Sequence, residues 1–144
     1  MILPALSIRQ PWCHAIPHFG KDVENRQWQY PTKFRGRCLI HASQRFDEAG
    51  LYFFRDLGMP EFPGSLEYER GGIVGIMDIV DCVRTSDSKW FAGEYIVDNG
   101  AKKRNYGLVI ANARPLPFQP IKGQLNFFDV GVGADLEEEI KRAA

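Results

Sequence analysis

The segment GGIVGIMDIVDCV, residues 71–83, is the strongest strand signal in the sequence. Both faces of this extended run are apolar apart from Asp78 and Asp81. A strand that is apolar on both sides must be covered on both sides, as the central strand of a small barrel is. The three glycines of the segment favour a curved sheet, because glycine inside a strand often marks a bulge or a tight bend.

Shorter strand and helix signals flank this segment on both sides. Apolar or alternating runs bounded by turn residues predict further strands over residues 2–8, 23–28, 37–43, 106–111 and 124–130. Helices are expected from the start signal Gln10-Pro11-Trp12, over residues 47–57, and at about residues 134–142. The run Arg114-Pro115-Leu116-Pro117 is expected to separate the last two strands, because proline interrupts a ladder. About five to six strands with two to three short flanking helices predict the α+β class, built on a small curved β-barrel.

Length and composition place the chain among ordinary globular domains. It has 144 residues, of which 44% are hydrophobic and 25% charged, so disordered, collagen-like and coiled-coil classes are excluded. No apolar run is long enough to span a membrane, and the first residues lack the features of a secretion signal. Cys13, Cys38 and Cys82 stand far apart in an odd number, which predicts free thiols and no disulfide framework. We therefore expect a cytoplasmic domain without a membrane partner.

The charges are segregated along the chain although 18 basic residues balance 18 acidic ones. Between Arg9 and Arg45 there are seven basic residues and two acidic ones, and residues 99–128 hold five basic residues and no acidic one. If these two basic segments meet in space, they form a positive surface that suits an anionic ligand such as a nucleic acid. The alternative is that the charges are spread over the surface without a common role.

The motif Gly20-Lys21-Asp22-Val23-Glu24-Asn25-Arg26 is the first candidate site. In a strand, residues two apart share a face, so Glu24 and Arg26 are expected on one side, with Lys21 at the mouth of the strand. Lys21 and Arg26 could contact phosphate while the Glu24 carboxylate orients them or accepts hydrogen bonds from a base. The alternative is a structural salt bridge between Glu24 and Arg26.

Other residue types that suit a nucleic acid lie close to this motif in the sequence. Trp12 and Trp28 are either core residues or a stacking platform, and we expect one of them packed and one partly exposed. His41 is either a buried, hydrogen-bonded histidine or a general base. Lys122 is either a phosphate contact or a solvated loop lysine. The full set of expected nucleic-acid contacts is Arg9, Trp12, Lys21, Glu24, Arg26, Trp28, Arg35, His41, Ser43 and Lys122.

Several other chemistries find no support in the sequence. His14 and His18 have the spacing of two metal ligands on one helix face, but Pro17 interrupts the turn and no acid accompanies them. Phosphate-binding loops, dinucleotide-binding glycine motifs and nucleophile-elbow motifs are absent from the sequence. We expect neither a metal nor another cofactor.

Several short motifs together resemble the ASCH domain family of the PUA-like superfamily. In the first half of the chain they are LSIRQPW (6–12), Gly20-Lys21, Glu24-Asn25-Arg26, Trp28, Arg35-Gly36 and LIHA (39–42). In the second half they are GIVG (72–75), Asp81-Cys82, PIKG (120–123) and Phe127-Phe128. The resemblance covers about Ala5 to Val130. It implies a single stand-alone ASCH domain over residues 1–144, with its core at 5–130, a C-terminal helix at about 134–142, and a PUA-like barrel with a cleft.

The resemblance implies a ligand related to RNA, but members of the family differ in what they do. Some are nucleic-acid-binding modules, some are ribonucleases that act on single strands, and a small branch comprises amidohydrolases that deacylate N4-acetylcytidine. The GxKTxTxR motif of that branch places its lysine on Lys21 and its threonine nucleophile on Glu24. The chain therefore lacks the hydroxyl that the covalent step of that branch requires.

Two functional hypotheses follow, with a third that involves no nucleic acid. The first is a module that binds RNA or another single-stranded nucleic acid through a basic cleft with aromatic stacking. The second is a hydrolase, either a metal-independent ribonuclease or a modified-nucleoside amidohydrolase, with Lys21 and Glu24 as the catalytic pair and Ser7, Ser43 or Tyr106 as partners. Its ligand would be RNA or a modified nucleobase or nucleoside. The third is a module whose partner is a protein.

Overall fold

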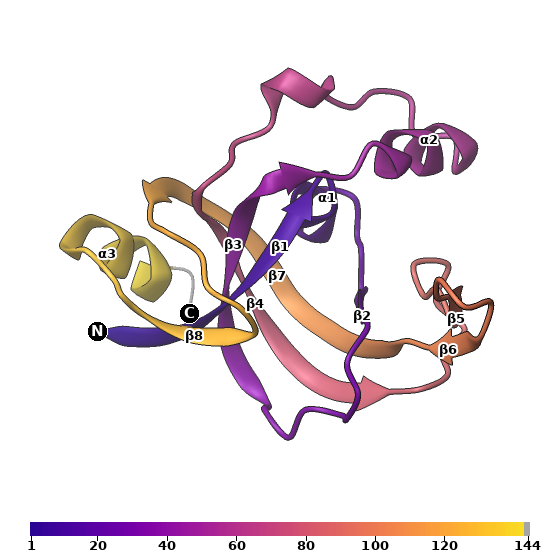
Figure 1. Cartoon of the computed structure of the whole chain (residues 1–144). Coiled ribbons are helices and arrows are strands. Elements are labelled where there is room, and N and C mark those ends of the chain that lie inside the picture. The colour runs from indigo at the N-terminus through magenta and orange to yellow at the C-terminus, as the bar shows by residue number, and fades with distance from the viewer. Residues whose placement is uncertain (143–144) are drawn as a thin grey trace.

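A computed structural model describes residues 1–142, and the chain has an α+β architecture (Figure 1). Its main sheet has six strands in the order β2-β7-β4-β3-β1-β8. β1 and β3 run parallel, whereas the other neighbouring strands run antiparallel, so the sheet is mixed. The strands are β1 (Ile2–Gln10), β2 (Val23–Arg26), β3 (Gly36–Phe46), β4 (Gly72–Val83), β7 (Tyr106–Pro120) and β8 (Phe127–Gly131).

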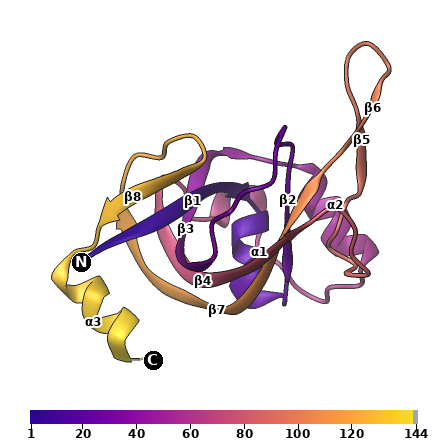
Figure 2. The ribbon, with the colours of Figure 1, turned by 90° about the horizontal axis from the view of Figure 1, so that it is seen from below.

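The helices and a short ribbon complete the described part of the chain. The helices are α1 (Trp12–His18), α2 (Ala49–Asp56), α3 (Ala134–Arg142) and a 3-10 turn, η1 (Ser65–Glu67). β5 (Glu94–Ile96) and β6 (Lys102–Arg104) form a ribbon that projects away from the main sheet (Figure 2). Each of these strands has three residues, too few to show a periodic pattern, and the sequence does not predict them. Within residues 1–142 no helix has both the length and the apolar character needed to cross a membrane.

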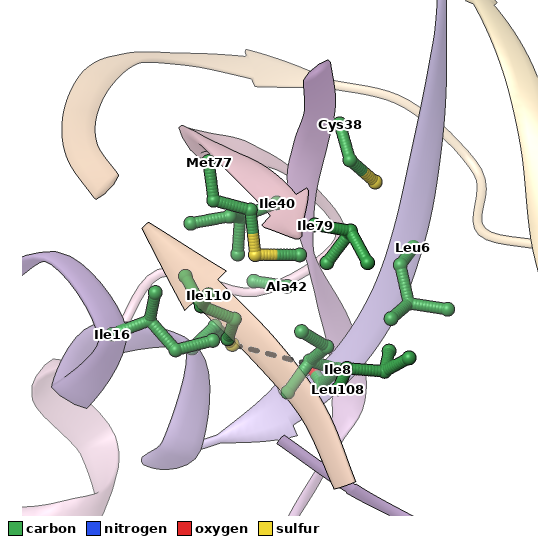
Figure 3. Close-up of a cluster of buried hydrophobic side chains, with 11 residues drawn as sticks. Leu6, Ile8, Ile16, Cys38, Ile40, Ala42, Met77, Ile79, Leu108 and Ile110 are labelled. Atoms are coloured by element: carbon green, nitrogen blue, oxygen red, sulfur yellow. Dashed lines mark hydrogen bonds between the residues drawn. The ribbon is translucent and has the colours of Figure 1, made fainter. Parts of the chain in front are cut away.

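β4 lies between β7 and β3, as its apolar faces predict. The side chains on its two faces enter different hydrophobic clusters. Met77 and Ile79 join the cluster that fills the concave side of the sheet, together with Ile16 of α1 (Figure 3). Ile73 and Ile76 join a second cluster, which contains Leu136 and Ile140 of α3 among other residues. The curved sheet is therefore packed on both sides, by α1 within its curve and by α3 outside it (Figure 2).

The prediction of a closed barrel is wrong. Within residues 1–142 no ladder joins the two edge strands, β2 and β8, so the sheet is curved but open. β8 pairs with β1 only from Ile2 to Leu6, which leaves residues 7–10 of β1 without a strand on that side. β2 has only four residues and faces this free edge through polar side chains, of which Arg26 donates a hydrogen bond to the Ser7 carbonyl oxygen. A side chain thus occupies the place where a closing ladder would run.

The proline run does not end a strand, because β7 continues without interruption from Tyr106 to Pro120. β2 pairs only with residues 106–109 of β7, so the later part of β7 is an edge where proline removes no ladder hydrogen bond on the outer side. The register to β4 shifts between the pairs Gly75↔Pro115 and Ile73↔Gln119, as a bulge requires. β8 accordingly begins later than predicted, at Phe127.

Candidate functional site

The free edge of β1 borders an open cleft of about 840 Å³. Its walls come from β1, the start of α1, β2, the end of β3, and the connection between β7 and β8. The lining residues are Ser7, Arg9, Trp12, Glu24, Asn25, Arg26, Gln27, Ser43, Gln44, Arg45, Asp47 and residues 122–126. The cleft therefore lies where the sheet fails to close.

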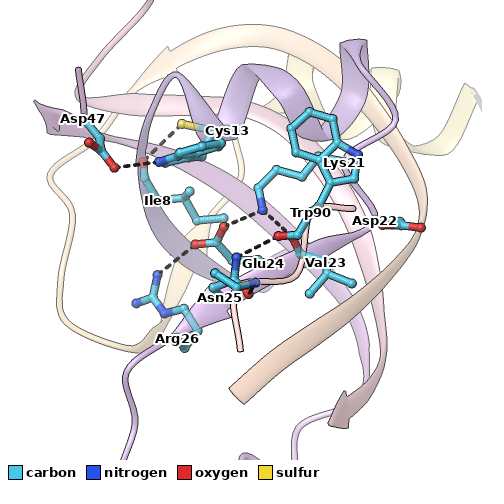
Figure 4. Close-up of polar contacts among 12 residues, drawn as sticks. Ile8, Cys13, Lys21, Asp22, Val23, Glu24, Asn25, Arg26, Asp47 and Trp90 are labelled. Carbon is cyan, nitrogen blue, oxygen red and sulfur yellow. Dashed lines mark hydrogen bonds and ion pairs between the residues drawn. The ribbon is translucent and has the colours of Figure 1, made fainter. Parts of the chain in front are cut away.

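A buried ion-pair network forms one wall of the cleft (Figure 4). The side chains of Lys21 and Glu24 are only 2% and 8% exposed, and Lys21 Nζ lies 3.3 Å from Glu24 Oε1. Arg26 Nη1 lies 3.4 Å from the other carboxylate oxygen, Oε2, so one carboxylate bridges two cations. The structural salt bridge between Glu24 and Arg26 is therefore present. Lys21 lies behind the wall and not at the mouth of the strand as predicted. Its backbone N–H donates to the carbonyl oxygen of Ala15 within α1, which holds this residue against the helix.

Two indole rings enclose the Lys21 ammonium group on its other sides. The nitrogen Nζ lies 5.6 Å from the centroid of Trp12 and 5.9 Å from that of Trp90, both within the range of cation–π attraction. Nζ also donates to the Val23 carbonyl oxygen. Trp12 is held in place by a 2.9 Å hydrogen bond from Nε1 to Asp47 Oδ2. Only the half-buried Trp12 among these rings lines the cleft.

The second predicted tryptophan, Trp28, lies outside the set of cleft-lining residues. It is also half-buried, and its ring packs against Phe127 with 5.9 Å between centroids. The guanidinium carbon of Arg26 lies 5.4 Å from the Trp28 centroid, so Trp28 supports a cleft residue from outside. Trp28 therefore contributes to the site through Arg26.

His41 lies beneath the cleft, with 1% of its surface exposed. Its Nδ1 is 3.0 Å from Ser7 Oγ, and its Nε2 is 2.7 Å from the Ile121 carbonyl oxygen. The histidine thereby connects β1 to the start of the β7–β8 connection. A Cβ atom at Gly123 would lie 2.7 Å from His41 Cε1, so glycine permits the close approach of this connection.

Four cations line the cleft, and they come from both basic segments. Arg9, Arg45 and Lys122 are exposed, whereas Arg26 is half-buried. The segments meet only in part, because Lys102, Lys103 and Arg104 lie on the β5–β6 ribbon and Arg114 donates to carbonyl oxygens of α3. The two carboxylates of the lining already have partners, Glu24 in its ion pairs and Asp47 with Trp12. Arg26 is itself one of the partners of Glu24, and Asp47 keeps its charge beside the neutral indole N–H. The four cations still outnumber the two carboxylates, so the net charge of the lining is positive.

Two of the predicted residues are placed elsewhere. Arg35 is outside the set of lining residues and pairs with Asp81 at 3.3 Å on the exposed surface. Tyr106 is buried, and its ring lies 5.1 Å from the guanidinium carbon of Arg84. The structure thus brings Arg9, Trp12, Glu24, Arg26, Ser43 and Lys122 together at the cleft.

Sequence reasoning missed some residues of the site. Arg45 follows His41 and Ser43 at a spacing of two on β3, and this alternation could have identified it. Trp90 lies in an irregular stretch between β4 and β5, and no periodic pattern points to it. Gln124 and Asn126 lie in the β7–β8 connection, where the sequence gives no signal beyond the neighbouring Lys122.

His14 and His18 stack on each other with 4.2 Å between ring centroids. Burial, and then the charge of His18, lowers the pKa of His14 to about 4. Within residues 1–142 no cluster of three or more histidine, cysteine or acidic side chains could hold a metal ion. His14 also packs edge to face against Phe19 and Tyr68.

The low pKa of His14 predicts a loss of stability in mild acid. In the unfolded chain the imidazole takes up a proton below pH ~6.5, whereas in the folded chain it stays neutral until about pH 4. The contribution of neutral His14 to the stability of the fold is therefore fully present above pH ~6.5, and it is lost as the pH falls towards about 4. After allowance for the partial exposure of His14, we expect the free energy of unfolding to fall by about 1–2 kcal/mol. Urea denaturation of wild type and of His14→Gln, above pH ~6.5 and again near pH ~4, measures how much of the acid loss comes from His14. An equal acid loss in the variant would contradict it.

Comparison with protein families matches residues 6–120 to the ASCH domain. A search of curated proteins finds no match to the chain. The matched range begins in β1 and ends with β7, so it contains most of the main sheet and all cleft residues except those of the β7–β8 connection. The mixed α+β architecture is consistent with the PUA-like fold of that family. The chain belongs to the ASCH domain family.

Proposed function

We propose that the cleft binds single-stranded RNA. The observation that carries this proposal is the set of four cations, Arg9, Arg26, Arg45 and Lys122, that line one cleft and outnumber its two carboxylates. Membership of the ASCH family, which is associated with RNA binding, supports the same ligand class. A modified nucleobase or nucleoside would use the same groups as a smaller ligand.

The exposed cations suit the phosphate backbone. Arg9, Arg45 and Lys122 come from β1, β3 and the β7–β8 connection, so they line the cleft from more than one side. A backbone that passes between them could contact several cations at once, and each contact releases a counterion. We therefore expect an affinity that falls steeply as salt rises.

The wall formed by Trp12, Glu24 and Asn25 suits a base. Trp12 presents part of an indole ring that is fixed by Asp47, and a splayed base can stack on such a ring. The Glu24 carboxylate lines the cleft and can accept a hydrogen bond from an exocyclic amino group. Asn25 is itself engaged, with its Nδ2 donating to Trp90 and its Oδ1 accepting from Ala92, so it holds the wall rigid.

A second candidate function of the same cleft is hydrolysis of RNA by Lys21 and Glu24. The specific observation in favour is that these two titratable side chains lie 3.3 Å apart and nearly buried beside the cleft. Lys21 itself is absent from the lining residues and is enclosed by Trp12 and Trp90. Binding is therefore the primary proposal, and cleavage is a separate outcome of the test.

The test follows the mobility shift and the integrity of a labelled single-stranded RNA of mixed sequence across a potassium chloride series in EDTA. Wild type is compared with Arg9→Gln and Arg45→Gln. We expect each variant to bind about tenfold more weakly, because one charge-assisted contact is lost. The slope of log Kd against log salt should fall by about 0.7 per cation removed.

Arg55→Gln is the matched control, because Arg55 is an exposed arginine on α2 that pairs with the adjacent Asp56 and stacks on Tyr52, outside the cleft. It removes the same charge outside the cleft and should bind RNA like wild type. Equal weakening by all three variants, or no shift at any salt, would overturn the proposal. Cleavage in EDTA that is lost in a folded Lys21→Met variant would establish the hydrolase instead.

A further inference from the structure

Ser7 and His41 form a polar pair at the edge of the cleft. They are direct partners in the parallel register of β1 and β3, so their side chains point to the same face of the sheet. Ser7 Oγ lies 3.0 Å from His41 Nδ1. Ser7 lines the cleft and is half-buried, whereas His41 is 1% exposed and lies behind it. A hydroxyl with access to the cleft is thus backed by a sequestered imidazole.

The hydrogen bonds of His41 fix which nitrogen carries the proton. Nε2 lies 2.7 Å from the Ile121 carbonyl oxygen, which can only accept, so Nε2 must carry a hydrogen. In the neutral ring Nδ1 is then an acceptor, and the Ser7 hydroxyl donates to it. This is the arrangement of a nucleophile, a general base and a group that orients the base. The orienting group here is a backbone carbonyl.

The surroundings of Ser7 define what it could attack. Gly123 approaches so closely that a Cβ atom there would lie 3.1 Å from Ser7 Oγ, so a larger residue would block the hydroxyl. Arg26 Nη1 donates to the Ser7 carbonyl oxygen over 3.3 Å, so a cation borders this residue. Arg9 and Lys122 on the same cleft favour a substrate that carries a negative charge.

We propose that Ser7 and His41 form a nucleophile–base dyad that hydrolyses carboxylic esters of small anionic molecules. This activity is distinct from RNA binding and does not depend on it. It also does not use Lys21 or Glu24 as reacting groups.

The chemistry balances with water as the only co-reactant. His41 Nδ1 takes the hydroxyl proton as Ser7 Oγ forms a bond to the acyl carbon. The bond from that carbon to the leaving oxygen then breaks, and His41 returns the proton to that oxygen, which departs as the alcohol. Water next attacks the acyl-Ser7 ester, His41 accepts its proton, and Ser7 Oγ leaves and regains a proton as the carboxylic acid is released.

Two measurements test the dyad. Wild-type protein is incubated with a fluorophosphonate probe, and the modified residue is identified by peptide mass spectrometry. We expect the adduct on Ser7 and not on Ser43, a second cleft serine, whose Oγ accepts from Arg45 N–H and has no hydrogen bond to a histidine within residues 1–142. Hydrolysis of 4-nitrophenyl acetate and of the negatively charged 4-nitrophenyl hemisuccinate is then followed, and the charged ester should be the better substrate.

The variants separate a catalytic from a structural role. Ser7→Ala should lose both the adduct and the turnover, and His41→Gln should slow labelling by about 100-fold or more. Ser65→Ala, which removes a hydroxyl outside the cleft on η1, should behave as wild type. Thermal unfolding shows whether each variant is folded. If His41→Gln does not fold, the mapping of the adduct on wild-type protein still tests the dyad.

No adduct on Ser7, equal adducts on Ser7 and Ser43, or an unchanged labelling rate in folded His41→Gln would overturn the dyad. None of these outcomes affects the RNA mobility shift, so the two proposals fail independently.

Discussion

Glu24→Gln is expected to lower the free energy of unfolding by about 3–5 kcal/mol, because it leaves the nearly buried Lys21 without a counter-charge. In wild type the carboxylate lies 3.3 Å from Lys21 Nζ. In the variant the ammonium keeps neutral partners alone: the amide oxygen that replaces the carboxylate, the Val23 carbonyl oxygen and the faces of Trp12 and Trp90. These neutral partners do not replace the full charge that burial requires. Urea denaturation at neutral pH measures the loss.

Removing the cation of the pair, in Lys21→Met, should lower the free energy of unfolding less than Glu24→Gln does. In Lys21→Met the Glu24 carboxylate keeps its second cation, because Arg26 Nη1 lies 3.4 Å from Oε2. Combining Lys21→Met with Glu24→Leu removes both charges, and the double variant should be more stable than Glu24→Gln alone.

Glu61→Gln is the control for the loss of a carboxylate. Glu61 is exposed and takes part in none of the ion pairs found in residues 1–142, so its change should remain within about 0.5 kcal/mol. A loss for Glu24→Gln as small as that for Glu61→Gln would show that Lys21 does not depend on its counter-charge.

The strands that the sequence predicted best are those whose side chains are buried by the sheet itself. β4 is apolar on both faces and occupies an inner position, and β1 and β3 are apolar runs that pair with each other in the concave cluster. Barrel closure could not be predicted in the same way. It depends on where β8 begins along β1, and this is set by the path of the β7–β8 connection, whose Gly123 packs against His41. The apolar pattern of a strand does not encode that path.

The part of the candidate site that the sequence predicts consists of residues that are close together along the chain. Lys21, Glu24 and Arg26 stand close together along the chain, and they form one network in the structure. The depth of Lys21 was not predictable, because it depends on Trp90, which comes from a segment far along the chain. The pairing of Ser7 with His41 likewise depends on the parallel register of two strands. Such long-range contacts have no signature in either strand alone.

Phe54→Ala is expected to destabilise the protein by about 3–5 kcal/mol, because it leaves a cavity at the centre of an aromatic cluster. Phe54 of α2 is 0% exposed. Its ring lies edge to face against Trp12 and Trp90, with centroid distances of 5.9 Å and 6.3 Å, and against Phe19 at 5.1 Å. We expect the melting temperature to fall by on the order of 10 °C. Differential scanning calorimetry measures both the temperature and the enthalpy.

Tyr52→Ala on the same helix is the matched control, because Tyr52 is 60% exposed and stacks only with Arg55 among the described aromatic and cation–π contacts. It removes an aromatic ring of similar size and should cost no more than about 0.5 kcal/mol. Equal losses for Phe54→Ala and Tyr52→Ala would mean that α2 does not support the rings beneath the cleft.

Combining Phe54→Ala with Glu24→Gln tests whether the cluster and the ion pair act together. Both changes alter the surroundings of Lys21, one by loosening its two indole neighbours and the other by removing its counter-charge. Neighbouring sites that share partners couple by about 0.5–3 kcal/mol, so the double variant should depart from the sum of the two single losses. A sum that holds within about 0.3 kcal/mol would place the two changes in independent parts of the structure. Non-additivity would instead establish that the aromatic cluster of α2 fixes the ion pair that forms the cleft wall.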